Sequence, residues 1–403
     1  MNKEILYLIG VFPRRSETFI FREVEVMRRI TPIRVVTFSK NTLDAFDDPG
    51  RILDTVESPD RTIHKEALKY FLRRPLRSVR CIAGWFLLPH RNAGKRWKAI
   101  KKSAYALWLL DLIEKKPTQH IHVHFLGWVS EVALVVSRIT GIPWSASAHA
   151  NDIYVYRNAL KNKLSEASFV STCTAYNRQT LLTYNDLAHK IHLDYHGIPT
   201  SIFNDFIRPQ KDPTLPFKII TVGRLVEKKG FNYLIRACGV LKKRGFRFEL
   251  ILIGDGPLRE SLSVAIQQEH VSDCVTMAGE LNNTQVLREI ASAALFVMPS
   301  IITSNGDRDG IPNVIIEAMF LKTPVVATDV SGIPEVVKHR ETGLLCEPAN
   351  ALALADAMSE SLTQSDQTRA CMASAYQFVN NYFDMEKNVR RLYEHIVPSE
   401  KNL

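Results

Sequence analysis

The sequence has no apolar run of the roughly 18 to 20 residues that a bilayer-spanning helix needs. Its first residues, Met1–Glu4, lead directly into a short strand-like run, without the long apolar segment and small-residue cleavage site of a signal peptide. No C-x-x-C pair occurs, and several cysteines lie inside apolar runs. We therefore expect a cytoplasmic chain with reduced core thiols, without a disulfide framework or a zinc site. The six cysteines are Cys81, Cys173, Cys238, Cys274, Cys346 and Cys371.

Acidic residues are nearly missing from one segment. Residues 61–102 hold thirteen Lys and Arg but a single acid, Glu66, so this segment carries a charge of +12. The whole chain carries +10, so the remaining residues together are slightly negative. Its aromatic residues stand among Leu and Ile, which suits an apolar surface better than a platform for stacked bases. They are Tyr70, Phe71, Trp85, Phe86 and Trp97. We predict that the segment docks on an anionic membrane surface and that it binds no nucleic acid. A solvated basic face and a nucleic-acid-binding module are the alternatives.

The chain of 403 residues is too long for one hydrophobic core, which predicts two domains. Short β-branched runs alternate with helical stretches, six runs in each half, and this pattern is typical of parallel sheets covered on both faces. The expected strands are Ile5–Ile9, Ile33–Phe38, His120–Phe125, Trp144–His149, Phe169–Cys173 and Lys190–Tyr195, then Phe217–Val222, Phe248–Ile253, Cys274–Ala278, Leu295–Met298, Val325–Thr328 and Gly343–Cys346.

The predicted fold is α/β, with two doubly wound, Rossmann-like domains that face a cleft. Three prolines interrupt residues 207–216, which therefore read as a linker. We expect a first domain at 1–205, a linker at 206–216 and a second domain at 217–374. Residues 375–403 have a helical pattern, and we expect a helix that packs back on the first domain. Because ligands of parallel sheets bind outside the carboxyl ends of the strands, the polar motifs after the strands are the candidate site.

Asp309 and Glu317 stand eight positions apart, the first in a Gly-rich loop and the second in a predicted helix whose first turn holds Pro312. A helix N-terminus behind such a loop favours an anion, while the two carboxylates can accept hydrogen bonds from hydroxyl groups. A ligand with phosphates in the middle and polyols at both ends, a nucleotide-sugar, fits this combination. The alternative is a helix with an acid in its first turn and Glu317 on a solvated face.

Two further loops follow strands. Arg224 and Lys229, between Gly223 and Gly230, are placed to neutralise a diphosphate leaving group, and a solvated basic loop is the alternative. Gly254 and Gly256 lack the third glycine of a dinucleotide fingerprint, since Arg259 stands there. We interpret this turn as one that lets a nucleotide approach, not as a sign of NAD.

Together these motifs resemble family 4 of the glycosyltransferases, retaining enzymes with the GT-B fold. The resemblance covers 217–348 and includes the segments at 223–230, 254–257, 299–300, 309–319, 324–328, 332–337 and 343–345. The first half is less similar. Its segments 12–20 and 149–154 look like members that build exopolysaccharides such as colanic acid.

The resemblance implies transfer of a hexose, with retention, from a nucleoside-diphosphate sugar to a lipid-linked saccharide acceptor in bacterial exopolysaccharide or cell-surface polysaccharide synthesis. UDP-sugar is the favoured donor. Arg224 and Lys229 would hold the diphosphate, Glu317 the ribose, and Asp309, where relatives commonly have Glu, the transferred sugar. Gly254, Gly256, Gly310, Ile311, Pro312 and Asn313 would complete the donor site.

His149 would lie at the reacting centre, with a core histidine as the alternative, and Ser16, Glu17 and Thr18 would lie on the acceptor side. Such sites need no metal and no cofactor, because fixed cations neutralise the leaving group. The enzyme would work in the cytoplasm, peripherally on the inner face of the membrane. A non-hydrolysing nucleotide-sugar epimerase on the same architecture is the alternative enzyme, but that activity would give the basic segment no function.

Overall fold

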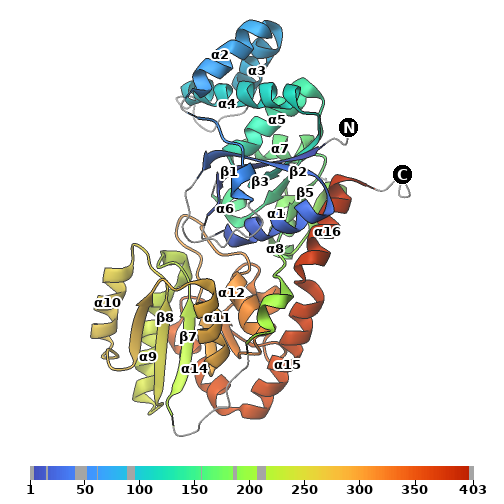
Figure 1. Cartoon of the computed structure of the whole chain (residues 1–403). Coiled ribbons are helices and arrows are strands. Elements are labelled where there is room, and N and C mark those ends of the chain that lie inside the picture. Colours follow the sequence, from blue (N-terminus) through green and yellow to red (C-terminus); the bar gives the residue numbers. More distant parts are fainter. Residues whose placement is uncertain are drawn as a thin grey trace. The chain divides into compact units, whose positions relative to one another are not determined.

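The computed structural model describes residues 4–14, 17–40, 52–60, 62–88, 96–155, 157–184, 188–206 and 215–398, with the side chains at 53, 96–101 and 365 left aside. The chain forms two compact units (Figure 1). The first unit joins 1–197 to 385–403, and the second consists of 198–384. Among the described helices, none is both long and apolar enough to cross a membrane.

The first unit is built on a six-stranded parallel sheet in the order β2-β1-β3-β4-β5-β6. Alternate residues of β1 face opposite sides: Leu6 and Leu8 belong to one apolar cluster, while Ile5, Tyr7 and Ile9 belong to another. The sheet is therefore covered on both faces, as the apolar runs predict. Its strands are β1 (Glu4–Phe12), β2 (Ile33–Lys40), β3 (Thr118–His124), β4 (Trp144–Ala148), β5 (Val170–Thr172) and β6 (Ile191–Leu193).

Helices from distant parts of the chain cover this sheet. On one face α5 packs on the strands, α4 packs on α5, and α2 and α3 pack on α4. On the other face α16 packs against α1, where Arg29 pairs with Glu386 at 2.5 Å. The helices are α1 (Thr18–Ile30), α2 (Ile63–Arg73), α3 (Pro75–Leu87), α4 (Arg96–Lys115), α5 (Trp128–Thr140), α6 (Ala150–Tyr154), α7 (Leu160–Glu166), α8 (Ala175–Leu182) and α16 (Met385–Ile396).

The second unit has its own six-stranded parallel sheet, in the order β12-β11-β10-β7-β8-β9, and its own apolar core. The strands are β7 (Phe217–Val222), β8 (Phe248–Ile253), β9 (Val275–Gly279), β10 (Leu295–Met298), β11 (Val325–Thr328) and β12 (Leu344–Cys346). The helices are α9 (Phe231–Lys243), α10 (Arg259–Gln268), α11 (Asn283–Ser292), α12 (Asn313–Phe320), α13 (Ile333–Val336), α14 (Ala351–Thr363) and α15 (Ser365–Tyr382).

The α/β fold class and the two doubly wound sheets are confirmed, and each of the twelve predicted strands is present within a few residues of its expected bounds. The domain bounds differ from those expected. The first unit's main segment ends at 197 instead of 205, because Ile198 donates a backbone hydrogen bond to Phe383 (2.8 Å) and Phe203 stacks on Phe320 (4.8 Å between ring centroids). Most of the expected linker, 207–214, lies outside the described residues.

The tail also differs from the single helix that the sequence predicts for 375–403. It consists of α15, which begins at Ser365, and α16, with a break at Phe383 and Asp384. Helix α15 packs on α12 in the second unit, whereas α16 belongs to the first unit. The unit boundary therefore falls after Asp384 and not after 374.

Candidate functional site

Three loops meet at the carboxyl edge of the second sheet. They follow β7, β8 and β10, which are neighbours in the sheet, and the backbone ties them to one another. Leu225 donates a hydrogen bond to the carbonyl of Asp255 (2.9 Å), and Ile301 donates one to the carbonyl of Lys228 (2.9 Å). The motifs at 223–230, 254–257 and 299–312, up to about ninety residues apart in the sequence, therefore form one surface, as parallel strands require.

Glycine lets these loops approach closely. Gly254 has φ +135°, and a Cβ there would stand 2.1 Å from the carbonyl oxygen of Gly223. Gly230 has φ +64°, and a Cβ there would stand 1.9 Å from the carbonyl oxygen of Pro299. Only glycine tolerates both the backbone conformation and the contact. The predicted role of Gly254 and Gly256, approach of a nucleotide, stays a prediction, but the close backbone packing around Gly254 is a fact of the fold.

An ion cluster occupies the same edge. The Lys229 ammonium lies 2.8 Å from Oδ2 of Asp309, which also accepts a hydrogen bond from the Ser300 hydroxyl (3.0 Å). Lys228 lies 3.1 Å from Asp307 and 3.7 Å from the other oxygen of Asp309. Burial alone would raise the pKa of Asp309, but the two ammonium groups and the hydrogen bonds outweigh it and lower this pKa. Asp309 is therefore an ionised carboxylate held by cations.

This cluster joins two residues that the sequence assigns to different parts of a ligand. Lys229 is predicted to hold the diphosphate and Asp309 the transferred sugar, and in this structure they neutralise each other. Sequence reasoning placed Ser300 in one of the motifs that follow the strands, but it assigned no role to Ser300, Lys228 or Asp307. The signal for Ser300 was its place just after β10, and that for Lys228 was its place beside Lys229. Arg224 lies in the β7 loop with an exposed side chain.

Helix α12 begins beside the cluster. Pro312 is the residue before the helix, one position earlier than the first turn in which the sequence places it, and its carbonyl accepts a hydrogen bond from Ile315 (3.0 Å). Gly310 and Ile311 lie in the preceding loop, and Asn313 is the first helical residue. Glu317 is only 5% exposed, so the alternative of a solvated face is wrong for this carboxylate.

His149 stands in the first unit, directly after β4 and before α6. It is 7% exposed, and its Nε2 has no hydrogen-bond partner among the described residues. Its backbone N–H donates to Asp152 (3.2 Å), and the rings of Phe19 and Phe125 pack on its imidazole, with centroids 5.2 and 4.4 Å away. Burial, and then the neighbouring imidazoles, hold the pKa of His149 well below its usual range, so the ring is neutral at neutral pH.

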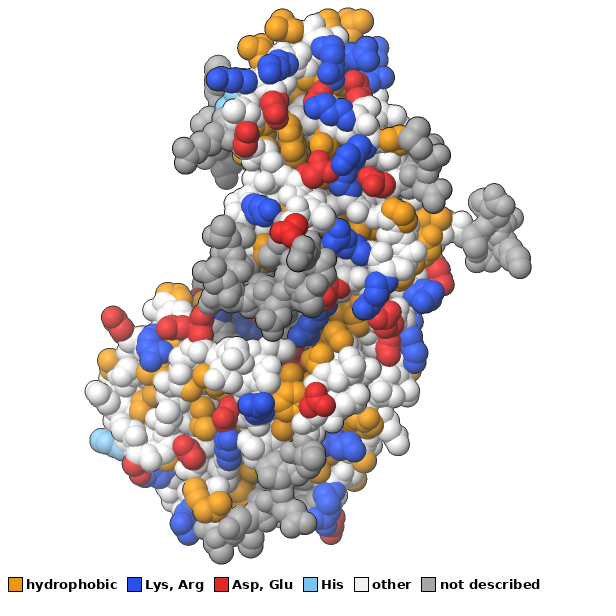
Figure 2. Space-filling model, in the orientation of Figure 1, with side chains coloured by type: hydrophobic (Ala, Val, Ile, Leu, Met, Phe, Trp, Pro, Cys, Tyr) orange, Lys and Arg blue, Asp and Glu red, His pale blue; other side chains and the backbone are white. Residues whose placement is uncertain are grey.

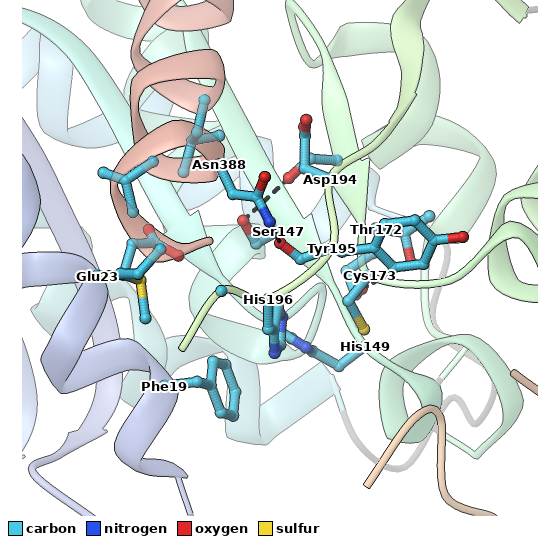
Figure 3. A pocket seen from close by; sticks show the side chains of 16 residues that line it. Phe19, Glu23, Ser147, His149, Thr172, Cys173, Asp194, Tyr195, His196 and Asn388 are labelled. Carbon is cyan, nitrogen blue, oxygen red and sulfur yellow. Dashed lines mark hydrogen bonds between the residues drawn. The ribbon is translucent and has the colours of Figure 1, made fainter. Parts of the chain in front are cut away.

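A small cavity of about 30 Å³ adjoins His149 (Figure 3). Its wall includes Phe19, Cys173, Asp194 and His196, none of which the sequence predicts as site residues. The available signal was the same as for His149: Cys173 directly follows β5, and His196 closely follows β6. Burial lowers the pKa of His196 to about 4, so this imidazole is also neutral.

The expected acceptor-side residues lie at the start of α1. Thr18 is the first residue of the helix. Glu17 precedes it at the N-cap position without a capping hydrogen bond from its side chain, which pairs with Arg14 at 2.8 Å. Burial raises the pKa of Glu17, although the Arg14 guanidinium opposes this shift. Ser16 lies outside the described residues.

Comparisons with known proteins give a consistent picture. A family described as "Glycosyl transferases group 1" matches residues 203–378. The amylovoran biosynthesis glycosyltransferase AmsK of Erwinia amylovora is 38% identical over 168 residues, 42% of this chain and 41% of that protein. The putative colanic acid biosynthesis glycosyltransferase WcaL of Escherichia coli is 35% identical over 204 residues, 50% of each chain. This chain thus spans about half the length of these relatives.

Two solved structures share the fold over nearly the whole chain. A glycosyltransferase of Rickettsia africae is 16% identical with a TM-score of 0.73, over 99% of this chain and 100% of that one. Anabaena Alr3699/HepE, solved in complex with UDP, is 16% identical with a TM-score of 0.70, over 97% and 98%. At these identities the similarity shows the fold alone, and it is that of GT-B glycosyltransferases.

The close contact of the β7 and β8 loops predicts a difference between two glycines of the second unit. Alanine at either Gly254 (φ +135°) or Gly245 (φ +83°) requires an unfavourable backbone conformation, at a cost of about 1 to 2 kcal/mol. Only at Gly254 does the new Cβ meet a backbone atom; at Gly245 nothing lies within 4 Å. Gly254→Ala should therefore lower the free energy of unfolding by at least about 2 kcal/mol more than Gly245→Ala in urea denaturation. Equal losses would contradict the contact.

Proposed function

Residues 203–378 match the family of group 1 glycosyl transferases, and from this match we propose that the chain is a retaining glycosyltransferase. It moves a hexose from a nucleoside-diphosphate sugar, with UDP-sugar favoured, to a lipid-linked saccharide in bacterial exopolysaccharide or cell-surface polysaccharide synthesis. The observation that carries the proposal is the cluster of Lys228, Lys229 and Asp309 at the carboxyl edge of the second sheet, beside the N-terminus of α12. The names of the relatives, which cite amylovoran and colanic acid, support the pathway class.

The donor diphosphate binds where cations are already fixed. The partly buried Lys229 and the exposed Arg224 flank the same loop, and the N-terminus of α12 adds the positive end of a helix dipole. These groups favour the charge that develops on the departing diphosphate. Because they are part of the protein, no metal ion is needed. Glu317, buried in α12, accepts hydrogen bonds from the ribose, and the glycine turn at 254–256 leaves room for the nucleotide.

Asp309 and Lys229 exchange partners when the donor binds. Without donor, Asp309 balances the charge of Lys229. A phosphate oxygen is an equally good anionic partner for the ammonium group, so donor binding releases the carboxylate to accept a hydroxyl hydrogen bond from the transferred sugar. The leaving phosphate then guides the acceptor hydroxyl to the face of the anomeric carbon that it vacates, which retains the configuration. His149, a neutral imidazole, acts at the reacting centre, and Glu17 and Thr18 serve the acceptor.

Helices α2 and α3 form the surface that contacts the membrane holding the acceptor's lipid. We call this surface, residues 63–87, the apolar-basic platform. Six large apolar side chains are exposed there, with Leu72 at 72% and Leu76 at 79%. In Figure 2, hydrophobic and basic side chains gather at the end of the first unit that carries these helices. Exposed apolar groups among cations are typical of a surface that lies in the headgroup region of a membrane. The six are Leu68, Leu72, Leu76, Val79, Phe86 and Leu87.

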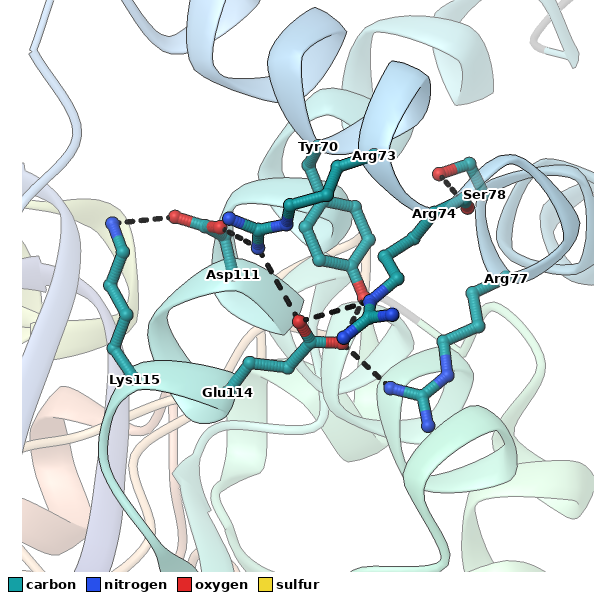
Figure 4. A network of polar contacts seen from close by, with 8 residues as sticks. All are labelled: Tyr70, Arg73, Arg74, Arg77, Ser78, Asp111, Glu114 and Lys115. Atoms are coloured by element: carbon teal, nitrogen blue, oxygen red, sulfur yellow. Dashed lines mark hydrogen bonds and ion pairs between the residues drawn. The ribbon is translucent and has the colours of Figure 1, made fainter.

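The charge available to a membrane is smaller than the +12 counted from the sequence. Arg73, Arg74 and Arg77 converge on Glu114 of α4, and Arg73 also pairs with Asp111 (Figure 4). Among the described residues, the shortest hydrogen bond to Glu114 comes from Arg77, at 2.7 Å. The side chains of Lys65, Lys69 and Arg80 are exposed and have no acidic partner among the described residues. We propose that these three, with the apolar groups, hold the enzyme on the anionic inner face of the cytoplasmic membrane.

Replacing the cations of the β7 loop tests the donor site. Arg224→Ala and Lys229→Ala should each lower the transfer rate by about 10²- to 10³-fold, the loss expected when one donor to a developing anion is removed. Arg224 is exposed, so its variant should unfold like the wild type, whereas Lys229→Ala leaves the largely buried Asp309 without its nearest partner and should be less stable. Lys243→Ala, an exposed cation of α9, is the control. Turnover close to the wild type in both loop variants would show that the diphosphate binds elsewhere.

Charge reversal on the platform tests membrane docking. Each cation near an anionic surface contributes about 1 kcal/mol, so Lys65→Glu, Lys69→Glu and Arg80→Glu together should cost at least about 3 kcal/mol of vesicle affinity. The control triple, Arg236→Glu, Lys243→Glu and Arg288→Glu, makes the same charge change on exposed residues of the second unit. Sedimentation with phosphatidylserine-containing vesicles measures both. An equal loss of vesicle affinity in the two triple variants, or equal binding of the wild type to neutral vesicles, would show that 61–102 is a solvated basic face.

A further inference from the structure

We propose that His149, Cys173 and His196 form a binding site for a thiophilic divalent ion of the Zn²⁺ class, and that an ion bound there reversibly blocks sugar transfer. The second half of this proposal rests on the proposed function, because the ion would withdraw His149 from the reacting centre. The first half, ion binding, rests on the geometry of the first unit alone.

The three residues are brought together by adjacent strands. His149 directly follows β4, Cys173 directly follows β5, and His196 closely follows β6, which lie side by side in the sheet. One ligand atom of each, an imidazole nitrogen or the thiol sulfur, lies within 4.8 Å of the other two. Tetrahedral Zn²⁺ separates its ligands by about 3.3 to 3.8 Å, so shifts of about 1 Å close the site. Figure 3 shows the three side chains grouped on one side of the cavity.

One nitrogen in this group is suited to a ligand. Nε2 of His149 is buried and has no hydrogen-bond partner among the described residues. Leaving such an atom unpaired is destabilising, and a bound ion would offset this cost. Aromatic packing holds the rings in place, since Phe19 contacts the imidazoles of both His149 and His196, the latter stacked at 4.1 Å between centroids.

A second cluster in the same unit shows what a site of this kind requires. The ligand atoms of Glu23, His122 and His124 also lie within 4.8 Å of one another. Most of their polar atoms are already hydrogen-bonded: Nε2 of His124 bonds Glu23 at 3.1 Å, and His122 bonds Ser145 at 2.8 Å and Ser147 at 3.1 Å. Only Nδ1 of His124 has no partner among the described residues. An ion there would have to break these hydrogen bonds. The cluster at His149 also has sulfur, and it therefore is the better site.

The donor set selects the ion. Two imidazole nitrogens and a thiolate suit Zn²⁺, Co²⁺ and copper, whereas Mg²⁺ and Ca²⁺ require oxygen ligands. Binding deprotonates the Cys173 thiol and releases one proton to solvent for each ion, with no change of oxidation state. The adjoining cavity of about 30 Å³ has room for a water molecule as the fourth ligand.

Cobalt is the probe for ion binding, because a thiolate bound to Co²⁺ gives a charge-transfer band in the near ultraviolet and tetrahedral Co²⁺ absorbs strongly in the visible. The full chain, stripped with a chelator, should develop both signals with Co²⁺ and lose them when Zn²⁺ displaces the cobalt. Cys173→Ser should abolish the charge-transfer band, and His196→Gln should weaken Co²⁺ affinity by at least about tenfold. Cys346→Ser and His124→Gln are the matched controls and should bind like the wild type.

Absence of the charge-transfer band in the wild type, or its persistence in Cys173→Ser, would overturn the site. Circular dichroism without metal shows whether each variant is folded, and Cys173→Ala replaces a serine variant that is not. For the second half, Zn²⁺ should inhibit transfer by the wild type, a chelator should restore it, and Cys173→Ser should need at least about tenfold more Zn²⁺. Cobalt signals without Zn²⁺ inhibition would overturn the inhibition but keep the site. Cobalt signals with no transfer under any condition would instead count against the proposed function.

Discussion

The parallel arrangement of the strands is the constraint on which both candidate sites depend. In a parallel sheet the carboxyl ends of neighbouring strands meet at one edge, so the loops that follow them must meet as well. In the second unit this brings the loops after β7, β8 and β10 into backbone contact, and glycines at 230 and 254 allow that contact. In the first unit the same rule groups His149, Cys173 and His196 after three adjacent strands. Each site is therefore assembled by topology from residues that are distant in sequence.

The ion pair between Lys229 and Asp309 limits how the proposed donor site can work. Both side chains are largely buried, at 14% and 11% exposure, and a buried charge without a partner is strongly destabilising. The fold must therefore keep the two charges balanced at every stage. A ligand that brings phosphate oxygens to Lys229 and hydroxyl groups to Asp309 maintains this balance. A nucleotide-sugar carries both groups at adjacent positions, which is why we prefer it to a ligand with phosphates alone.

The sequence predicts the positions of the strands better than it predicts which side chains pair with one another. All twelve strands were predictable, because short β-branched runs buried on both faces leave a clear pattern between helices. The residues after the strands were predictable for the same reason. The pairing of Asp309 with Lys229, and of three arginines with Glu114 some forty residues away, arises only from tertiary packing and leaves no local signal. The break between α15 and α16 at Phe383 was also not predicted, because the apolar periodicity continues from α15 into α16.

The most direct test of the account is calorimetry of the full chain with UDP and GDP, with no sugar present. Asp309→Asn removes the charge that holds Lys229, so the variant should bind the free diphosphate at least as tightly as the wild type. Glu317→Gln keeps the shape of the side chain but loses the charge that we propose accepts hydrogen bonds from the ribose. Its affinity should fall by about tenfold, the effect of one charge-assisted hydrogen bond. An equal loss of affinity in the two variants, or no diphosphate binding by the folded wild type, would contradict the account.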